Sequence, residues 1–188
     1  MRVNVIGTSG SGKTTFGRQL ADILNIQFIE LDAIFWGPNW SHLDDENLKS
    51  KLIEALKGDQ WVLDGNYSRT TPIKWKRVEV VIWIDYSFPR TLLQAINRAI
   101  QRLFSREEIW PGTGNRETFR MFFSKESIVL WTITTYHRRR KKILKLMNAP
   151  EYKQIRFHQL SSPKMAAAFL NAVRLDPLTL YNGIQTQR

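Results

Sequence analysis

The sequence predicts an α/β protein in which a five-stranded parallel sheet lies between two layers of helices. Two observations predict it. Short runs of β-branched and apolar residues alternate with amphipathic helical stripes, and the first run leads through a glycine-rich turn into a helix. Strands that alternate with helices are typical of parallel sheets with right-handed crossovers. The 188 residues, 43% of them hydrophobic, are enough to bury a core. We expect one domain over residues 1–175 and a fraying C-terminal tail over 176–188.

The elements follow in order from local patterns. Strands are expected over residues 3–6, 27–31, 61–63, 78–84 and 155–160, each a short run rich in apolar residues. Helices are expected over residues 16–24, 48–56, 92–103, 125–147 and 163–173. In the third helix, the apolar stripe is expected to be Leu92, Ile96, Ile100 and Leu103.

Boundaries between these elements carry their own signals. Ser41-His42-Leu43-Asp44 resembles a capping box before the second helix. Gly58 is a natural stop for that helix. Residues 107–125 contain proline, glycines and scattered charge, which predicts a loop or irregular insertion.

The glycine-rich turn, GTSGSGKTT at residues 7–15, fits the phosphate-binding pattern G-x-x-x-x-G-K-[ST] at every fixed position. Lys13 is expected to reach the β- and γ-phosphates of ATP, and the Thr14 hydroxyl to ligate Mg²⁺. A Gly/Ser turn without a ligand is the alternative, but strand, turn and helix stand in the order that the motif requires. The sequence therefore predicts the three-layer P-loop NTPase fold. The expected nucleotide-binding residues are Gly7, Thr8, Ser9, Gly10, Ser11, Gly12, Lys13, Thr14 and Thr15.

Two acidic residues follow predicted strands and should meet the turn at the carboxyl edge of the sheet. Asp64 follows three apolar or aromatic residues and is expected to hold Mg²⁺ together with Thr14. An aspartate in a simple turn before Gly65 is the alternative. Asp32 follows the second strand and is expected to accept a proton from an attacking hydroxyl, or to hydrogen-bond the phosphoryl acceptor.

Aromatic residues surround Asp32 in the sequence. Phe35, Trp36 and Trp40 suggest a pocket for an organic acceptor, with packing in the core as the alternative for each. Asn66 and Arg69, close behind Asp64, are expected to contact the acceptor as well.

Basic charge is concentrated in one third of the chain. The net charge is +11, and residues 86–147 hold 13 Lys/Arg against 4 Asp/Glu. Arg98 and Arg102 are four residues apart and share a helix face, where they could clamp phosphates. The run at 137–142, HRRRKK, could close over a nucleotide, bind nucleic acid without sequence specificity, or only be solvated.

The composition excludes several functions. With no cysteine, the chain has no disulfide, thiolate metal site or cysteine nucleophile. The three histidines lack metal-ligand spacing. No signal peptide or bilayer-spanning run is evident, so we expect a cytoplasmic protein that does not enter a membrane.

Three features together resemble the adenylate-kinase-like P-loop kinases. They are the turn at residues 7–14, Asp64-Gly65 after a strand, and Arg98-x-x-x-Arg102. The segments ELDAIFWGPNW and WVLDGNYS resemble, within that group, the DNA topology modulation (FlaR-related) proteins, over about residues 1–172. That name implies an effect on DNA topology, although no helix-turn-helix, zinc finger or topoisomerase motif accompanies it.

The resemblance implies roles for further residues. The Arg-x-x-x-Arg pair would begin a basic helical lid over approximately residues 98–145, with Arg98 along the adenine and Arg102 on phosphate. The loop with Ser161, Ser162 and Pro163 would hold the adenine edge.

The sequence also departs from adenylate kinases. They carry an arginine four residues after the aspartate of their Asp-Gly motif, whereas this chain has Ser68 there and Arg69 one position later. Asp32 instead resembles the acid of shikimate- and gluconate-kinase-like enzymes, which handles a hydroxyl acceptor.

These observations predict an ATP- and magnesium-dependent small-molecule kinase. Lys13, Asp32 and Arg102 are its expected catalytic residues, and the acceptor is left open between a nucleotide and a hydroxylated metabolite. The alternative is a nucleotide-dependent, nucleic-acid-binding regulator that affects DNA topology and grips the phosphate backbone with its basic third. The oligomeric state is left open.

Overall fold

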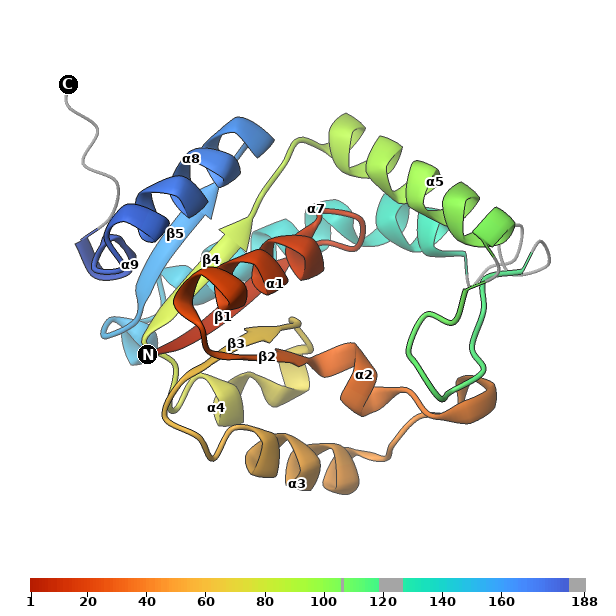
Figure 1. The fold of residues 1–188 in the computed structure, drawn as a ribbon, viewed down its shortest axis with the longest axis horizontal. Helices are drawn as coiled ribbons and strands as arrows, with labels where there is room; N and C mark the ends of the chain where they lie inside the picture. Colours follow the sequence, from red (N-terminus) through yellow and green to blue (C-terminus); the bar gives the residue numbers. More distant parts are fainter. Residues whose placement is uncertain (106, 119–126, 183–188) are drawn as a thin grey trace.

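The computed structural model describes residues 1–105, 107–118 and 127–182. Its five strands are β1 (Arg2–Gly7), β2 (Gln27–Glu30), β3 (Trp61–Asp64), β4 (Val80–Ile84) and β5 (Arg156–Leu160). They form one sheet in the order β2-β3-β1-β4-β5, and every neighbouring pair is parallel. The five-stranded parallel sheet predicted from the sequence is confirmed (Figure 1).

Helices cover both faces of this sheet. They are α1 (Lys13–Leu24), α2 (Leu31–Phe35), α3 (Asp45–Ala55), α4 (Thr71–Lys74), α5 (Phe88–Ser105), α7 (Ile128–Met147), α8 (Pro163–Leu175) and α9 (Thr179–Asn182). Three short 3₁₀ turns lie at Pro38–Trp40, Ser68–Thr70 and Pro150–Tyr152. One core cluster joins α1 and α8 to one face of the sheet, and a second joins α3, α4 and α7 to the other. The three-layer α/β arrangement is therefore as predicted. Within the described residues, no helix is long and apolar enough to cross a bilayer.

The buried side of α5 differs from the expected stripe of Leu92, Ile96, Ile100 and Leu103. The structure buries Thr91, Ala95 and Ala99 together with Leu103, and it leaves Ile100 exposed. The cause is the close approach of the glycine turn. A Cβ added at Gly10 would lie 2.7 Å from the Ala95 Cβ, so only small side chains fit along this side of the helix.

Two boundaries also differ from expectation, and two short helices are additional. The N-cap of α3 is Asp44, which accepts from the Asn47 backbone at 2.8 Å, rather than Ser41. The second strand ends at Glu30, so Asp32 lies in the first turn of the short helix α2. Helices α2 and α4 are too short to have produced a periodic apolar stripe.

The expected C-terminal tail is wrong over its first part. Residues 176–182 include α9, where Leu180 is fully buried, and the His158 ring hydrogen-bonds the Leu180 carbonyl at 2.7 Å. The buried Leu180 side chain thus holds this segment against the core, although the segment has little hydrophobic pattern of its own. Residues 183–188 lie outside the described part of the chain.

Gly65 provides a test of how tightly β3 and α2 are packed. Its φ is +137°, and a Cβ there would lie 2.6 Å from the Leu31 Cβ. We expect Gly65→Ala to lower the free energy of unfolding by about 2–4 kcal/mol, because backbone strain and overlap add. Urea denaturation measures the difference.

Gly58→Ala is the matched control, because a Cβ at Gly58 meets nothing within 4 Å. It should change stability by less than about 1 kcal/mol. Equal destabilisation by the two substitutions would contradict the packing described here.

Candidate functional site

The glycine turn connects the carboxyl end of β1 with the first residue of α1, as the sequence predicts. Gly10 and Gly12 adopt φ values of +81° and +85°, which non-glycine residues rarely tolerate. Thr8 and Ser11 are buried within the turn, and Lys13 is buried at the start of the helix. The turn therefore has the backbone form of a phosphate-binding loop at a helix N-terminus.

Asp64 lies directly across from this helix start. β1 and β3 are adjacent parallel strands, so the carboxyl end of β3 places Asp64 beside the turn. The Thr14 hydroxyl donates a hydrogen bond to Asp64 Oδ2. Burial raises the pKa of Asp64, while the nearby Lys13 charge and the Thr14 hydrogen bond oppose that rise. The pair expected to hold a metal is thus brought into contact.

The donor set of this pair fits Mg²⁺. The second carboxylate oxygen of Asp64 is buried and has no hydrogen-bond partner among the described residues. A buried, unsatisfied oxygen is costly unless a ligand completes it. Across the described ranges, no group of three or more His, Asp or Glu residues could hold a metal. Phosphate oxygens and water would therefore supply the other ligands, as is usual for Mg²⁺ at nucleotide sites.

Asp32 faces the same region from α2. Burial raises the pKa of Tyr67, and the charge of Asp32 and its hydrogen bond with the tyrosine raise it further. The charge of Asp32 also affects the pKa of Asp64 and of Arg139. Asp32 lies in a helix that the sequence did not predict. It nevertheless lies among the groups around the glycine turn, as expected from the sequence.

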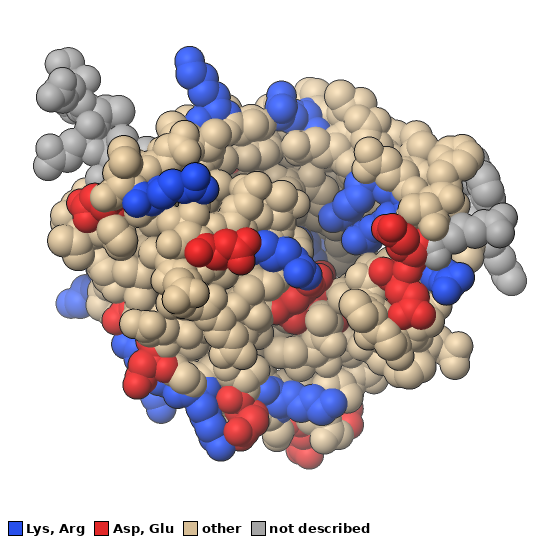
Figure 2. Space-filling view, in the orientation of Figure 1, with Lys and Arg blue, Asp and Glu red and all other residues tan. Residues whose placement is uncertain are grey.

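Arg98 and Arg102, the arginines expected to begin a lid, share one side of α5, next to its buried stripe. Burial lowers the pKa of Arg98, as does the neighbouring Arg102, while Glu117, Asp32 and Asp64 oppose that effect. Burial raises the pKa of Glu117, and the two arginine charges oppose it. Figure 2 shows one face of the molecule, with a hollow in which basic and acidic side chains meet. Arg98 therefore lies with the charged groups that surround the glycine turn.

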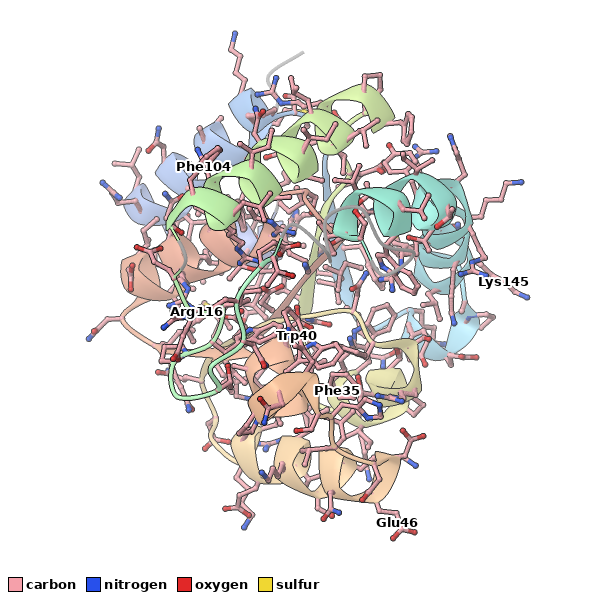
Figure 3. All side chains as sticks on the ribbon, turned by 90° about the vertical axis from the view of Figure 1, so that its right-hand side faces the viewer. Phe35, Trp40, Glu46, Phe104, Arg116 and Lys145 are labelled. Carbon is pink, nitrogen blue, oxygen red and sulfur yellow. The ribbon has the colours of Figure 1, made fainter. Side chains whose placement is uncertain are left out.

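Phe35, Trp36 and Trp40 pack mainly on one another and on neighbouring aromatic rings. The Phe35 ring lies 5.0 Å from that of Tyr67, and Trp36 stacks on Trp110 at 6.0 Å. Trp40 contacts Trp36 and Trp110 edge-on. In Figure 3, Trp40 lies beside the loop that carries Arg116. Contact of these three residues with an acceptor stays a prediction.

The segment 107–118 closes over the 36–40 segment. Trp110 Nε1 donates to Glu30 Oε1 at 3.1 Å. Asn115, almost fully buried, donates to the Gly37 carbonyl and accepts from the Trp40 backbone N–H, both at 2.8 Å. The described part of the expected loop is thus irregular, as predicted. It is held by hydrogen bonds against the end of β2 and the 36–40 segment. Residues 106 and 119–126 of the expected lid lie outside the described residues.

Helix α7 is anchored to the edge of the sheet by three polar contacts. Arg140 Nε donates to both oxygens of Asp85 at 3.1 Å, and the Tyr136 hydroxyl donates to the Tyr86 carbonyl at 2.7 Å. Arg139 Nη1 donates to Asn66 Oδ1 at 3.3 Å. Asn66 in turn donates to the Gly7 carbonyl at 3.0 Å, so it links the glycine turn to α7.

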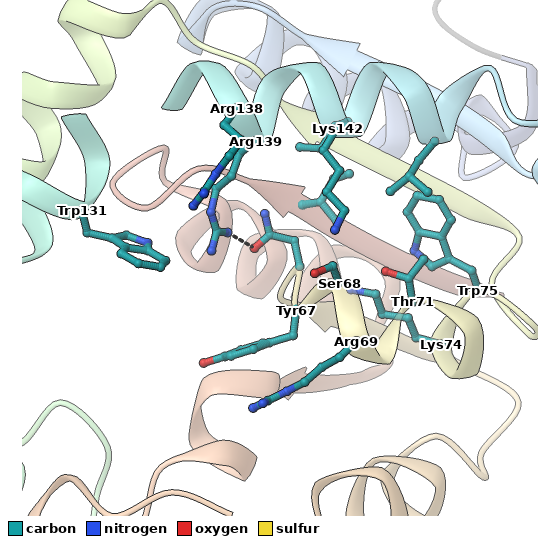
Figure 4. A pocket seen from close by; sticks show the side chains of 14 residues that line it. Tyr67, Ser68, Arg69, Thr71, Lys74, Trp75, Trp131, Arg138, Arg139 and Lys142 are labelled. Carbon is teal, nitrogen blue, oxygen red and sulfur yellow. Dashed lines mark hydrogen bonds between the residues drawn. The ribbon is translucent and has the colours of Figure 1, made fainter. Parts of the chain in front are cut away.

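A cavity of about 570 Å³ lies between α7 and the segment from β3 to α4 (Figure 4). We call it the α7 cavity. Its lining includes Asn66 and Arg69, two of the residues expected to bind an acceptor, and none of Asp32, Phe35, Trp36 or Trp40. Arg69 is also held by Asp45 at 2.8 Å and lies over the Phe35 ring. The basic run of α7 contributes Arg138, Arg139 and Lys142 to the wall.

The loop expected at the adenine edge follows β5. Ser162 caps α8 by accepting from the Met165 backbone at 3.2 Å, and Pro163 is the first residue of that helix. Ser161 is exposed, with its hydroxyl 3.1 Å from the Met165 sulfur. Their contact with adenine stays a prediction.

Several site residues were not found by sequence reasoning. Tyr67 lies in the WVLDGNYS segment, where no role was predicted for it. Lys74 occurs in a segment without a recognisable pattern, and Trp110, Asn115 and Glu117 lie in a loop. The basic run of α7 was recognised, but its spacing alone did not indicate which cations face a cavity. These residues reach the site through tertiary packing.

Comparisons with known proteins point to kinases. The family model described as shikimate kinase matches residues 9–36, the part of the chain from the glycine turn to Trp36. Shikimate kinase from Corynebacterium diphtheriae is 31% identical over 98 residues. That match covers 45% of this chain, and the chain spans 57% of the length of this curated relative.

Solved structures share the fold over nearly the whole chain. A sugar kinase from Janibacter has a TM-score of 0.51 and 16% identity, covering 96% of this chain and 94% of its own. Shikimate kinase from Bacteroides thetaiotaomicron has a TM-score of 0.51 and 13% identity, covering 93% and 97%. The chain therefore has the three-layer α/β fold found in P-loop kinases.

Lys74 makes the free energy of unfolding of the protein depend on pH. Its side chain is 1% exposed, and Nζ donates to the Gly65 carbonyl at 2.9 Å. Burial lowers the pKa of Lys74 to about 7, against the opposing charge of Asp64. An unfolded lysine titrates near 10.5, so the unfolded chain binds more protons between pH 7 and 10.5. Burying the charged Lys74 therefore lowers the free energy of unfolding by its largest amount below pH 7. That loss of stability becomes smaller as the pH rises from 7 to 10.5.

We expect wild-type stability, relative to Lys74→Met, to increase by roughly 2 kcal/mol between pH 7 and pH 9. Urea denaturation of both proteins at the two pH values measures this. Lys51→Met, at an exposed position on α3, is the control. Its free energy of unfolding should change with pH as that of the wild type does. A constant difference between wild type and Lys74→Met would show that Lys74 titrates normally.

Proposed function

We propose that this protein is an ATP-dependent kinase that transfers the γ-phosphoryl group to a hydroxyl of a small anionic acceptor. The observation that carries the proposal is the meeting of Asp64, Thr14 and Lys13 at a glycine turn, with Asp32 and several cations facing the same space. The match to the shikimate kinase model includes the turn from Ser9 onward and Asp32, which supports a hydroxyl acceptor. Shikimate, a hydroxylated carboxylate, is the first acceptor to test.

The residues around the turn divide the chemistry. The backbone of residues 8–13 and Lys13 bind the β- and γ-phosphates, and Thr14 and Asp64 hold Mg²⁺. When bound, the metal neutralises charge on the phosphate oxygens. The acceptor oxygen attacks the γ-phosphorus, the bond to the β-γ bridging oxygen breaks with its electron pair passing to ADP, and the hydroxyl proton passes to Asp32.

Arg102 is the arginine proposed to stabilise the equatorial oxygens of the transferring group. The charges that act on Arg98 come from Arg102, Glu117 and the two aspartates around the glycine turn, which favours a phosphate contact over stacking on adenine. Ser161 to Pro163 remain the proposed adenine edge. Asn66, Arg69 and Asp32 remain the proposed acceptor contacts, with the aromatic cluster of Phe35, Trp36 and Trp40 behind them.

Binding to nucleic acid, and with it the DNA topology role, stays a prediction from charge and motif resemblance. Part of the basic run on α7 has contacts within the fold, although Arg138, Lys141 and Lys142 are exposed. Arg140 pairs with Asp85, and Arg138, Arg139 and Lys142 line the α7 cavity. On the face that Figure 2 shows, basic side chains alternate with acidic ones. The mixed charge of this face favours a kinase site there over a nucleic-acid surface.

Lys13→Ala should abolish most ATP turnover while leaving the fold intact, because the ammonium neutralises charge on the β- and γ-phosphates. The assay is ADP release with Mg²⁺ and a panel of acceptors that starts with shikimate, scored above the rate without acceptor. Lys49→Ala, at an exposed position on α3, is the control. Wild-type turnover in a folded Lys13→Ala protein would rule out the proposed function.

Asp32→Asn should keep ATP·Mg binding and slow transfer by roughly 10²–10⁴-fold, as expected for loss of a general base. Isothermal titration measures binding of a non-hydrolysable ATP analogue, and steady-state kinetics measures transfer. A loss of nucleotide binding equal to the loss of transfer would instead assign Asp32 to the nucleotide site.

A further inference from the structure

The cations of the α7 cavity are unequally partnered. Arg69 pairs with Asp45, and Arg139 donates to Asn66. Within the described residues, Arg138 and Lys142 have neither an ion pair nor a hydrogen bond, and no Asp or Glu lines the cavity. These two side chains lie one turn apart on α7, on the same side of the helix. The cavity wall therefore carries positive charge that the protein does not neutralise.

The opposite wall presents hydrogen-bond donors. Ser68 and Thr71 line the cavity, and their hydroxyls have no hydrogen-bond partner among the described residues. Figure 4 shows Lys142 pointing from α7 toward Ser68 and Thr71. Lys74, buried beneath them, also lines the cavity. Its ammonium has three donors, of which one is used by the Gly65 carbonyl.

We propose that the α7 cavity binds a phosphate monoester, and that the phosphoryl acceptor is a hydroxylated metabolite that already carries this group. Arg138, Lys142, Ser68 and Thr71 hold the phosphate, while the reacting hydroxyl lies toward Asp32. The proposal rests on the proposed function for its description of the acceptor; the anion site itself does not.

The number of charges and donors favours phosphate over carboxylate. A phosphate monoester carries about −1.5 to −2 charges at neutral pH and three terminal oxygens. Two cationic side chains and two hydroxyls match that charge and provide a donor for every oxygen. A carboxylate has one charge and two oxygens, so it would leave a cation and a hydroxyl of this set without an anion.

Binding of inorganic phosphate tests the site directly. The protein is first saturated with a non-hydrolysable ATP analogue and Mg²⁺, so that phosphate cannot occupy the glycine turn. Phosphate and acetate are then titrated calorimetrically at constant ionic strength. We expect phosphate to bind more tightly than acetate.

Two matched variants identify the site. Lys142→Gln should weaken phosphate binding by about 10-fold, the usual scale for losing one charge-assisted hydrogen bond. Lys141→Gln removes the same charge from a neighbour that is exposed like Lys142 but does not line the cavity, and it should change binding by less than about 2-fold. Phosphate binding that is no tighter than acetate binding, or that responds equally to both variants, overturns the proposal.

Acceptor kinetics separates this inference from the proposed function. A polyol, its carboxylate and its phosphate monoester are compared as acceptors, alongside shikimate. We expect the phosphate monoester to have the highest kcat/KM, with its KM raised about 10-fold by Lys142→Gln and little changed by Lys141→Gln. If a carboxylate is the better acceptor and Lys142→Gln has no effect on it, the phosphate site is wrong and the kinase function stands. If phosphate binding depends on Lys142 but no compound is phosphorylated, the anion site stands and the kinase function fails.

Discussion

The arrangement of the site depends on one buried carbonyl, that of Gly65. Lys74 Nζ donates to it at 2.9 Å, and Asn4 Nδ2 donates to it at 3.1 Å. Asn4 is fully buried in the middle of β1, and its side-chain oxygen Oδ1 accepts from the Trp75 indole at 3.0 Å. Buried polar groups of this kind must all be satisfied, so they specify one local geometry. That geometry turns the chain after β3 and sets Asp64 and the residues behind it around the glycine turn.

A second set of contacts fixes the other wall of the site. The bifurcated hydrogen bond from Arg140 Nε to Asp85, and the hydrogen bond from Tyr136 to the Tyr86 carbonyl, attach α7 to the end of β4. Gln159 also donates to Asp85, at 2.6 Å, so β5 takes part in the same anchor. Because these contacts fix the rotation of α7, they decide that Arg138 and Lys142 face the cavity while Lys141 does not. In Figure 3, Lys145 on this helix points away from the body of the protein.

The aromatic cluster shows how one group of residues can serve packing and positioning at once. Trp110 stacks on Trp36 and also donates to Glu30, at the end of β2. These contacts hold the segment 107–118 against α2 and the turn at Pro38–Trp40. Glu117 is thereby placed near Arg98 and Arg102. The charges of the two arginines oppose the rise in the pKa of Glu117, and the charge of Glu117 opposes the fall in the pKa of Arg98. The docked loop thus influences the charge around the glycine turn without a regular element of its own.

The sequence by itself determined the parallel α/β sheet, the glycine turn, and the pairing of Thr14 with Asp64. These follow from local patterns, because strand-helix alternation fixes the topology and the carboxyl ends of parallel strands meet at one edge. It could not determine the buried side of α5, where close approach of Gly10 selects Ala95 over the larger Ile96 and Ile100.

The tertiary structure alone decided which basic residues of α7 line the cavity and that Lys74 is buried beneath it. A row of cations has the same sequence pattern whether it faces open solvent or lines a cavity. The difference arises only when contacts distant in sequence, such as Asp85 with Arg140 and Asn4 with Gly65, set the rotation of a helix and the path of a turn.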